Sequence, residues 1–175
     1  LAVIRFDVTV RAAVVACYLT VLLLITVVDL ATRRIPNVVV LPAAAAALIL
    51  AALGIYPGLR RSLVGGAIAL GIFLLAYALG GLFLRVIGGR AASSGPALGA
   101  GDVKLALFIG LSTGYPTIIP ALFFGTLSGA IVALGWIVIR LVQRRYRPFA
   151  AMAYGPYLAA GAAIALLWGE QLITR

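Results

Sequence analysis

The chain has 175 residues, of which 65% are apolar and only 10% are charged, and its mean hydropathy is +1.20. A soluble domain is about half apolar and about a quarter charged, so these few charges exclude a surface that faces water on all sides. The sequence therefore predicts a membrane protein, with residues 1–175 forming a single domain.

The net charge of +10 comes from 14 Lys and Arg residues against 4 Asp and Glu residues. In a soluble chain such an excess would suggest nucleic-acid binding. Here the basic residues cluster between apolar segments, as they do where they fix the orientation of a membrane protein. We therefore expect contact with membrane lipid and no nucleic-acid partner.

Cys17 is the only cysteine, and the chain has no histidine. A structural zinc site needs about four Cys or His ligands, which excludes that kind of site. The lack of histidine also excludes a Ser-His catalytic arrangement. We expect neither a metal nor another cofactor.

Apolar segments of near-spanning length run through the whole chain. A helix that crosses the hydrocarbon core needs about 20 apolar residues. Six segments are candidates, and the fourth is short, with Lys104 near its start; they run approximately over 12–31, 38–56, 62–84, 102–115, 117–139 and 155–173. The predicted fold is an all-α bundle of about six transmembrane helices, with a flexible cytoplasmic loop over about 85–101, which is rich in Gly and Ser.

The basic residues divide unequally between the two ends of this predicted bundle. Nine belong to one side, namely Arg33, Arg34, Arg85, Arg90, Lys104, Arg140, Arg144, Arg145 and Arg147. Five belong to the other side, namely Arg5, Arg11, Arg60, Arg61 and Arg175. Because basic residues are retained in the cytoplasm, the side with nine is expected to be cytoplasmic and both termini to lie outside.

The four acidic residues fall into two kinds. Asp7 precedes Arg11 by four residues, so we expect an interfacial ion pair, and Glu170 lies at the end of the sixth segment in a structural role. Asp29 ends an apolar run and Asp102 opens another. Acidic residues at such depth are candidates for function. Two segments separate them, so both are expected at the same, cytoplasmic edge.

Two carboxylates that share a proton can hydrolyse a peptide bond. The ionised group takes a proton from water, and the protonated group polarises the scissile carbonyl. Each aspartate also has a structural interpretation, since Asp102 can cap the fourth helix and Asp29 can pair with Arg33 four residues on. A proton- or ion-relay transporter and a non-catalytic assembly scaffold remain as alternative functions, because intramembrane acids also carry ions.

Three motifs in order resemble those of the prepilin peptidases, which are membrane aspartic endopeptidases of the GxGD class. The first is Asp29 followed after five residues by Ile35-Pro36-Asn37. The second is Gly99-Ala100-Gly101-Asp102-Val103-Lys104, which is similar to a GxGD-x-K pattern. The third is Tyr154-Gly155-Pro156-Tyr157. The resemblance covers essentially the whole chain and implies that Asp29 and Asp102 are catalytic and that the other motif positions support them.

The resemblance also implies a substrate, a pilin-like precursor in which a basic leader precedes an apolar helix. Cleavage would fall at their junction on the cytoplasmic side. Many family members also methylate the new amino terminus and carry a segment with paired cysteines, which this sequence lacks. We therefore expect peptidase action alone, with an unknown oligomeric state.

Elementary geometry gives several motif residues expected roles. Gly99 and Gly101 permit a positive φ and a close approach of backbone beside Asp102. Pro36 is expected to end the first helix, because a residue before proline disfavours helical geometry. Lys104 either shapes the local field or contacts lipid phosphate. Which aspartate acts as the base stays open, since the pair titrates as a unit.

Overall fold

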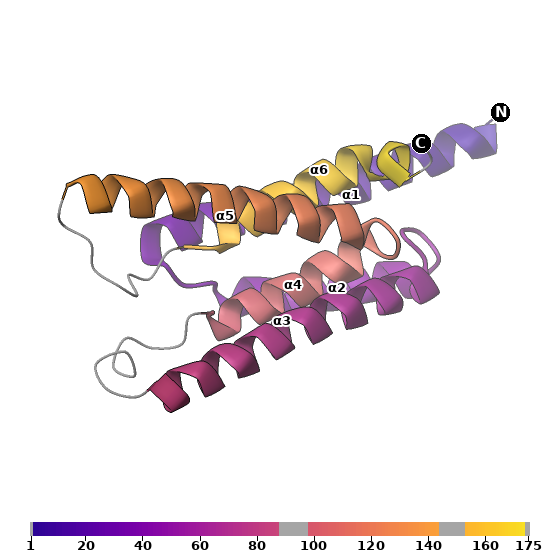
Figure 1. Ribbon diagram of the computed structural model, residues 1–175. Coiled ribbons are helices and arrows are strands. Elements are labelled where there is room, and N and C mark those ends of the chain that lie inside the picture. Colours follow the sequence, from indigo (N-terminus) through magenta and orange to yellow (C-terminus); the bar gives the residue numbers. More distant parts are fainter. Residues whose placement is uncertain (1, 88–97, 144–152, 174–175) are drawn as a thin grey trace.

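The computed structural model describes residues 2–87, 98–143 and 153–173. Within these stretches the structure is helical, with no strand (Figure 1). There are six helices: α1 (Ala2–Thr32), α2 (Asn37–Ala52), α3 (Leu59–Ile87), α4 (Ala100–Thr113), α5 (Ile118–Val142) and α6 (Gly155–Ile173). The predicted all-α fold is confirmed, and each helix overlaps one predicted segment.

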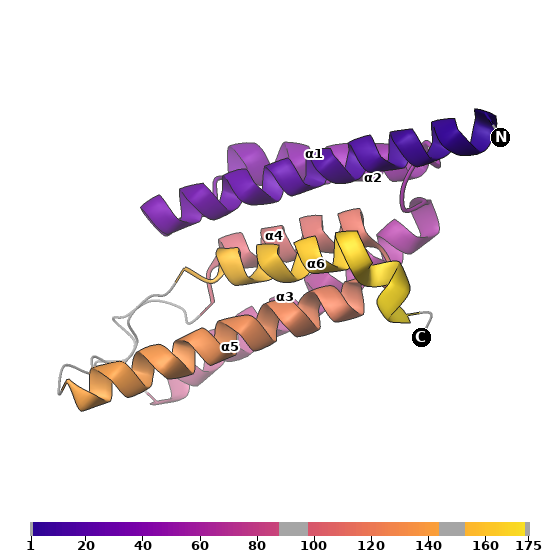
Figure 2. The same ribbon diagram turned by 90° about the horizontal axis from the view of Figure 1, so that it is seen from above.

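The helices form two layers of three. Figure 1 shows α1, α6 and α5 in one layer above α2, α4 and α3 in the other. Figure 2, turned by 90°, shows the same six helices as three stacked pairs, with α6 over α4 in the middle. The middle helices therefore have neighbours on both sides as well as across the layers.

Burial follows from this arrangement. The side chains of α4 are buried from Leu105 to Ala106 and from Phe108 to Thr113, although the helix is only 14 residues long. By contrast, α3 and α5 expose many large apolar side chains, as expected where a helix faces lipid. The aspartate-bearing start of α4 thus belongs to the most enclosed helix of the bundle.

Three helical stretches are long and apolar enough to cross a membrane, namely Thr9–Thr32, Leu59–Phe83 and Ile118–Val142. The stretches Asn37–Ala52 and Gly155–Gly169 are apolar but shorter. The chain is a membrane protein, and the helices that meet the length criterion are α1, α3 and α5. The shorter helices lie next to them and are covered by them on at least one side.

Glycines bring helices within a layer into close contact. A Cβ atom added to Gly65 of α3 or to Gly110 of α4 would collide with the backbone of the other residue. In the other layer, a Cβ on Gly161 of α6 would collide with the backbone of Ala121 and Gly125 in α5. Small residues allow such approach in lipid, where no hydrophobic force between helices exists.

The chain runs back and forth, so the start of α4, the start of α6 and the end of α1 share one end of the bundle (Figure 1). The start of α1 and the end of α6 lie near the opposite end. The predicted loop over 85–101 has shorter bounds, because residues 85–87 belong to α3 and residues 100–101 to α4. Its remaining central part, 88–97, lies outside the described residues.

Candidate active site

Asp29 lies in the last turn of α1 and is 4% exposed. Its Oδ2 accepts a hydrogen bond of 3.1 Å from the backbone N–H of Gly155, the first residue of α6. The first N–H groups of a helix have no partner within the helix and carry its positive end. The carboxylate is therefore held by a helix that lies 126 residues further along the chain.

The chain reverses directly after Asp29. Arg33 has a φ of 52°, a left-handed conformation usual for the residue after a helix, although glycine is the common residue there. The expectation that Pro36 ends α1 is wrong in detail, since α1 already ends at Thr32. Pro36 instead occupies the N-cap position of α2 with an extended backbone. The sharp exit behind Asp29 is present nonetheless.

Asp102 lies in the first turn of α4 and is partly exposed. Its Oδ2 accepts a hydrogen bond of 3.0 Å from the backbone N–H of Gly99, the N-cap residue. This is the carboxylate half of a capping box, and the other half is absent because glycine has no side chain. Asp102 therefore caps α4 through one carboxylate oxygen, as its structural interpretation predicts. Its second oxygen has no hydrogen-bond partner in the described part of the chain.

Ile35 lies between the two aspartate-bearing regions. A Cβ atom on Gly101 would lie 2.9 Å from the Cβ of Ile35, and a Cβ on Gly155 would lie 3.5 Å from its Cδ1. The same added atom on Gly155 would lie 2.6 Å from Oδ2 of Asp29. Glycine at both positions therefore allows the starts of α4 and α6 to pack closely against Ile35, in the segment that follows α1.

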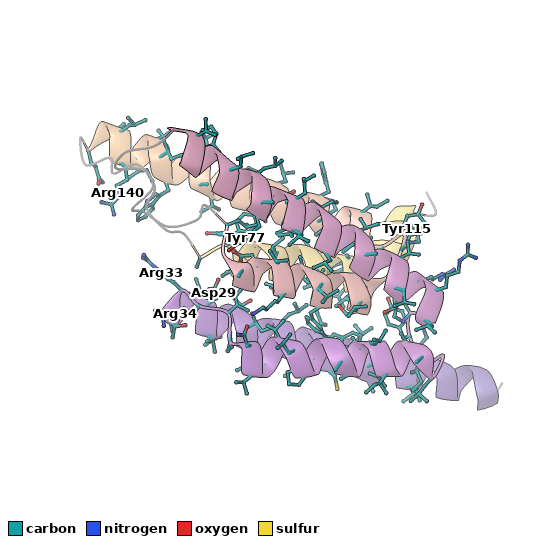
Figure 3. All side chains as sticks on the ribbon, turned by 90° about the horizontal axis from the view of Figure 1, so that it is seen from below. Asp29, Arg33, Arg34, Tyr77, Tyr115 and Arg140 are labelled. Atoms are coloured by element: carbon teal, nitrogen blue, oxygen red, sulfur yellow. The ribbon has the colours of Figure 1, made fainter. Side chains whose placement is uncertain are left out.

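Ile35 lies against Gly101, the residue before Asp102, and against Gly155, the partner of Asp29, so one side chain separates the surroundings of the two carboxylates. Each is also next to the start of a central helix, Asp29 at α6 and Asp102 at α4. Figure 3 shows Asp29 at the same end of the bundle as Arg33, Arg34 and Arg140, with Tyr115 at the opposite end. The structure thus brings the two acidic residues from distant helices to one end.

The expected role of Gly99 and Gly101 is corrected in one respect. Gly99 has a φ of −76°, Gly101 is helical, and the described glycines with a positive φ are Gly54, Gly58 and Gly114. A positive φ is therefore not the reason for glycine beside Asp102. The close approach is present at Gly101, through its contact with Ile35.

Lys104 and Asn37 meet across the layer formed by α2 and α4. The Lys104 Nζ donates a hydrogen bond of 2.8 Å to Oδ1 of Asn37, the first residue of α2. Neither of the two expected roles of Lys104 included this contact. Asn37 follows Ile35 by two residues, so the bond links the start of α2 to α4 close to the contact between Ile35 and Gly101.

Tyr154 precedes α6 and faces the same site. Burial, and secondarily the charge of Asp102, raise the pKa of its hydroxyl. The sequence motif included this tyrosine, but no role was predicted for it. Pro156 lies in the first turn of α6, where proline is tolerated because its missing N–H would have had no partner within the helix.

The arrangement brings two acidic groups, one buried and one partly exposed, to one end of the bundle. Among the described residues, no three His, Cys, Asp or Glu side chains gather as a metal site would require. Asp7 and Glu170 do not extend the site, since they belong to the opposite end of the bundle by their place in the sequence. The predicted pairing of Asp7 with Arg11 involves a side chain outside the described part.

Comparison with known proteins supports the resemblance seen in the motifs. A prepilin leader peptidase/N-methyltransferase of Bacillus subtilis (strain 168) is 32% identical over 176 residues, which covers 98% of this chain and 62% of that protein. Another of the same name from Pseudomonas aeruginosa is 33% identical over 154 residues, which covers 88% of this chain and 48% of the relative. The chain thus spans about half to three fifths of the length of these relatives.

No solved structure matches the chain. The model of the type IV leader peptidase family matches residues 16–134, more than half of the chain, and this range contains both Asp29 and Asp102. The chain therefore belongs to the type IV leader peptidase family.

Proposed function

We propose that this chain is an aspartic endopeptidase that removes the leader from pilin-like precursors, with Asp29 and Asp102 as its catalytic pair. The observation that carries the proposal is the convergence of these two carboxylates at one end of the bundle. Family membership supports peptidase chemistry, and the names of the relatives support the class of substrate.

The reaction needs one carboxylate ionised and the other protonated. The ionised group takes a proton from a water molecule, whose oxygen adds to the scissile carbonyl carbon. The protonated group gives its proton to the carbonyl oxygen, and the tetrahedral intermediate collapses when the departing amine receives a proton. Helix starts next to both carboxylates supply partial positive charge, so helix ends alone do not decide which aspartate is the base.

The other motif residues act by holding this geometry. Gly155 anchors Asp29 through its N–H, and Gly99 anchors Asp102 in the same way. Ile35 separates Gly101 from Gly155, while Lys104 and Asn37 fix the start of α2. These are positioning roles, and the catalytic role is limited to the two aspartates.

The substrate is expected to present a short basic leader followed by an apolar helix. The apolar helix lies in the bilayer beside the bundle, and the leader stays in water, so the scissile bond comes to the membrane edge. The larger share of basic residues at the aspartate end supports a cytoplasmic location of the site and an external location of both termini. The basic surface would repel a basic leader, so binding rests on the apolar helix.

The test is co-expression with candidate pilin-like precursors, read as a shift in precursor mobility on a gel. Asp29→Asn and Asp102→Asn should each reduce cleavage at least about hundredfold, because neither leaves a complete acid–base pair. Asp7→Asn and Glu170→Gln are matched controls, since both remove an acid from the opposite end. Cleavage that survives either dyad substitution would overturn the proposal and favour a scaffold, and loss of pH-linked ion flux would favour a relay.

A further inference from the structure

A cavity lies at the end of the bundle opposite the aspartates. It has a volume of about 290 Å³ and is bounded by α1, α6 and the connection between α2 and α3. Small-molecule sites have volumes of roughly 300–1,000 Å³, so this one is near the lower limit. Its apolar wall consists of Ala12, Val15, Leu166 and Leu167. Leu167 is 51% exposed, so the cavity opens on a surface that faces lipid.

The rim of the cavity is polar and cationic. Arg11, Tyr56 and Gln171 contribute a guanidinium, a phenol and an amide. The guanidinium carbon of Arg11 lies 5.1 Å from the ring centroid of Tyr56, which holds the cation at the rim. A guanidinium has five N–H donors, so it can serve a ligand in addition to its existing partners.

The position of the cavity along the bundle matches a membrane interface. Arg11 and Asp29 are 18 residues apart on α1, which corresponds to about 27 Å at 1.5 Å per residue. The hydrocarbon core of a bilayer is about 30 Å thick. If Asp29 lies at one edge of the membrane, Arg11 lies at the level of the head groups on the other.

A second feature is an unpartnered polar group one turn of α1 away from the cavity wall. The hydroxyl of Tyr18 is buried, with the side chain 4% exposed, and has no hydrogen-bond partner in the described part of the chain. Buried polar atoms are nearly always paired with protein or with ordered water. Tyr18 follows Val15 by three residues, about one turn further along α1 toward the aspartate end. The unpartnered group therefore belongs to the turn of α1 next to the cavity wall, although Tyr18 itself does not line the cavity.

We propose that this cavity binds the phosphate head group of an anionic phospholipid from the leaflet opposite the aspartates, with an acyl chain along its apolar wall. Arg11 pairs with the phosphate, and Gln171 and Tyr56 bind the polar part of the head group. Among the described residues, Arg11, Arg60 and Arg61 lie at this end of the bundle, so the surroundings attract anionic lipid.

The test is lipid retention by the purified full chain, measured by native mass spectrometry with equal amounts of phosphatidylglycerol and phosphatidylcholine. The wild type should retain phosphatidylglycerol preferentially, and Arg11→Gln should reduce that retention about tenfold by removing a charge-assisted contact. The matched control is Arg140→Gln. The guanidinium of Arg140 also lies over an aromatic ring, that of Trp136 at 4.6 Å, but it does not line the cavity.

A second variant guards against misfolding of Arg11→Gln. Ala12 lines the cavity and is exposed, so Ala12→Phe should fill the space without changing charge and should reduce retention equally. Unchanged retention in both variants, or an equal reduction in Arg140→Gln, would overturn the proposal. Competition by glycerol 3-phosphate would likewise overturn it, because a soluble phosphate lacks the acyl chain that the apolar wall requires.

Discussion

Asp29 and Asp102 are held by hydrogen bonds of nearly equal length but of different origin. The partner of Asp102 is Gly99, three residues away in the same turn. The partner of Asp29 is Gly155, 126 residues away on another helix. Asp102 is therefore positioned by local helix-capping geometry, whereas Asp29 is in place only when α1 and α6 have packed. The difference predicts that the Asp29 side of the site is more easily disturbed by small changes in packing.

The largest effect is expected from Gly155→Ala, compared with Gly99→Ala. The added Cβ at 155 would lie 2.6 Å from Oδ2 of Asp29 and would displace the carboxylate. A misplacement of about 1 Å can reduce a rate about hundredfold, and we expect a loss of that size in precursor cleavage. At 99 the Cβ would lie 3.1 Å from Oδ2 of Asp102, which can rotate, so the loss should stay below about tenfold.

The matched control for both is Gly71→Ala in α3, where an added Cβ would meet nothing within 4 Å. It should leave cleavage unchanged. Both variants should retain wild-type helix content by circular dichroism. If Gly99→Ala then reduced precursor cleavage as much as Gly155→Ala, the claim that Asp29 is more easily disturbed than Asp102 would be contradicted.

An intermediate effect is expected where the two halves of the site meet. Gly101→Ala would place a Cβ 2.9 Å from the Cβ of Ile35 and should reduce the cleavage rate about tenfold by separating α4 from the exit of α1. Ile35→Gly removes the opposing atom, so Gly101→Ala should cost much less in that background. A double-mutant cycle on single-turnover cleavage rates measures the coupling.

Ile35→Val is the control for this cycle, because valine keeps the Cβ atom and should give no rescue. Additive effects of Gly101→Ala and Ile35→Gly would show that the predicted contact does not determine the geometry of the site.

The smallest effect is expected from the hydrogen bond between Lys104 and Asn37. It is a single contact at an exposed position, so its loss should reduce cleavage less than about fivefold. Lys104→Met and Asn37→Ala should have equal effects, and the double variant should be no worse than either. If Lys104→Met abolished cleavage while Asn37→Ala did not, the lysine would have a role in the chemistry rather than in positioning. Cleavage assays of the three variants decide between these outcomes.

Much of this site could be predicted from the sequence, because hydropathy locates the helices and the number of membrane crossings between two residues tells whether they share an end of the bundle. Apolar segments located six helices, and an even number of crossings between Asp29 and Asp102 put both at one end. The meeting of Gly155 with Asp29 depends on how α6 packs on α1, and neither residue carries a local pattern that specifies a partner so far along the chain.

Local conformations were predicted less well than the topology. Arg33 adopts a left-handed conformation usually taken by glycine, so composition pointed to Pro36 as the helix terminator. The glycines beside Asp102 have ordinary φ values, and what requires one of them is the side chain of Ile35. Such requirements arise from neighbours in space, which a single sequence does not reveal.

The two aspartates also belong to different layers. Asp29 is on α1 with α6 and α5, and Asp102 is on α4 with α2 and α3 (Figure 1). Glycine contacts bind α3 to α4 and α5 to α6 so closely that each of these pairs has little freedom to shear internally. Asp29 on α1 belongs to neither pair, so the separation of the two carboxylates depends on how α1 packs on α6 and on the seam between the layers. A slide of one layer along the other would change the distance between them without disrupting either glycine-packed pair.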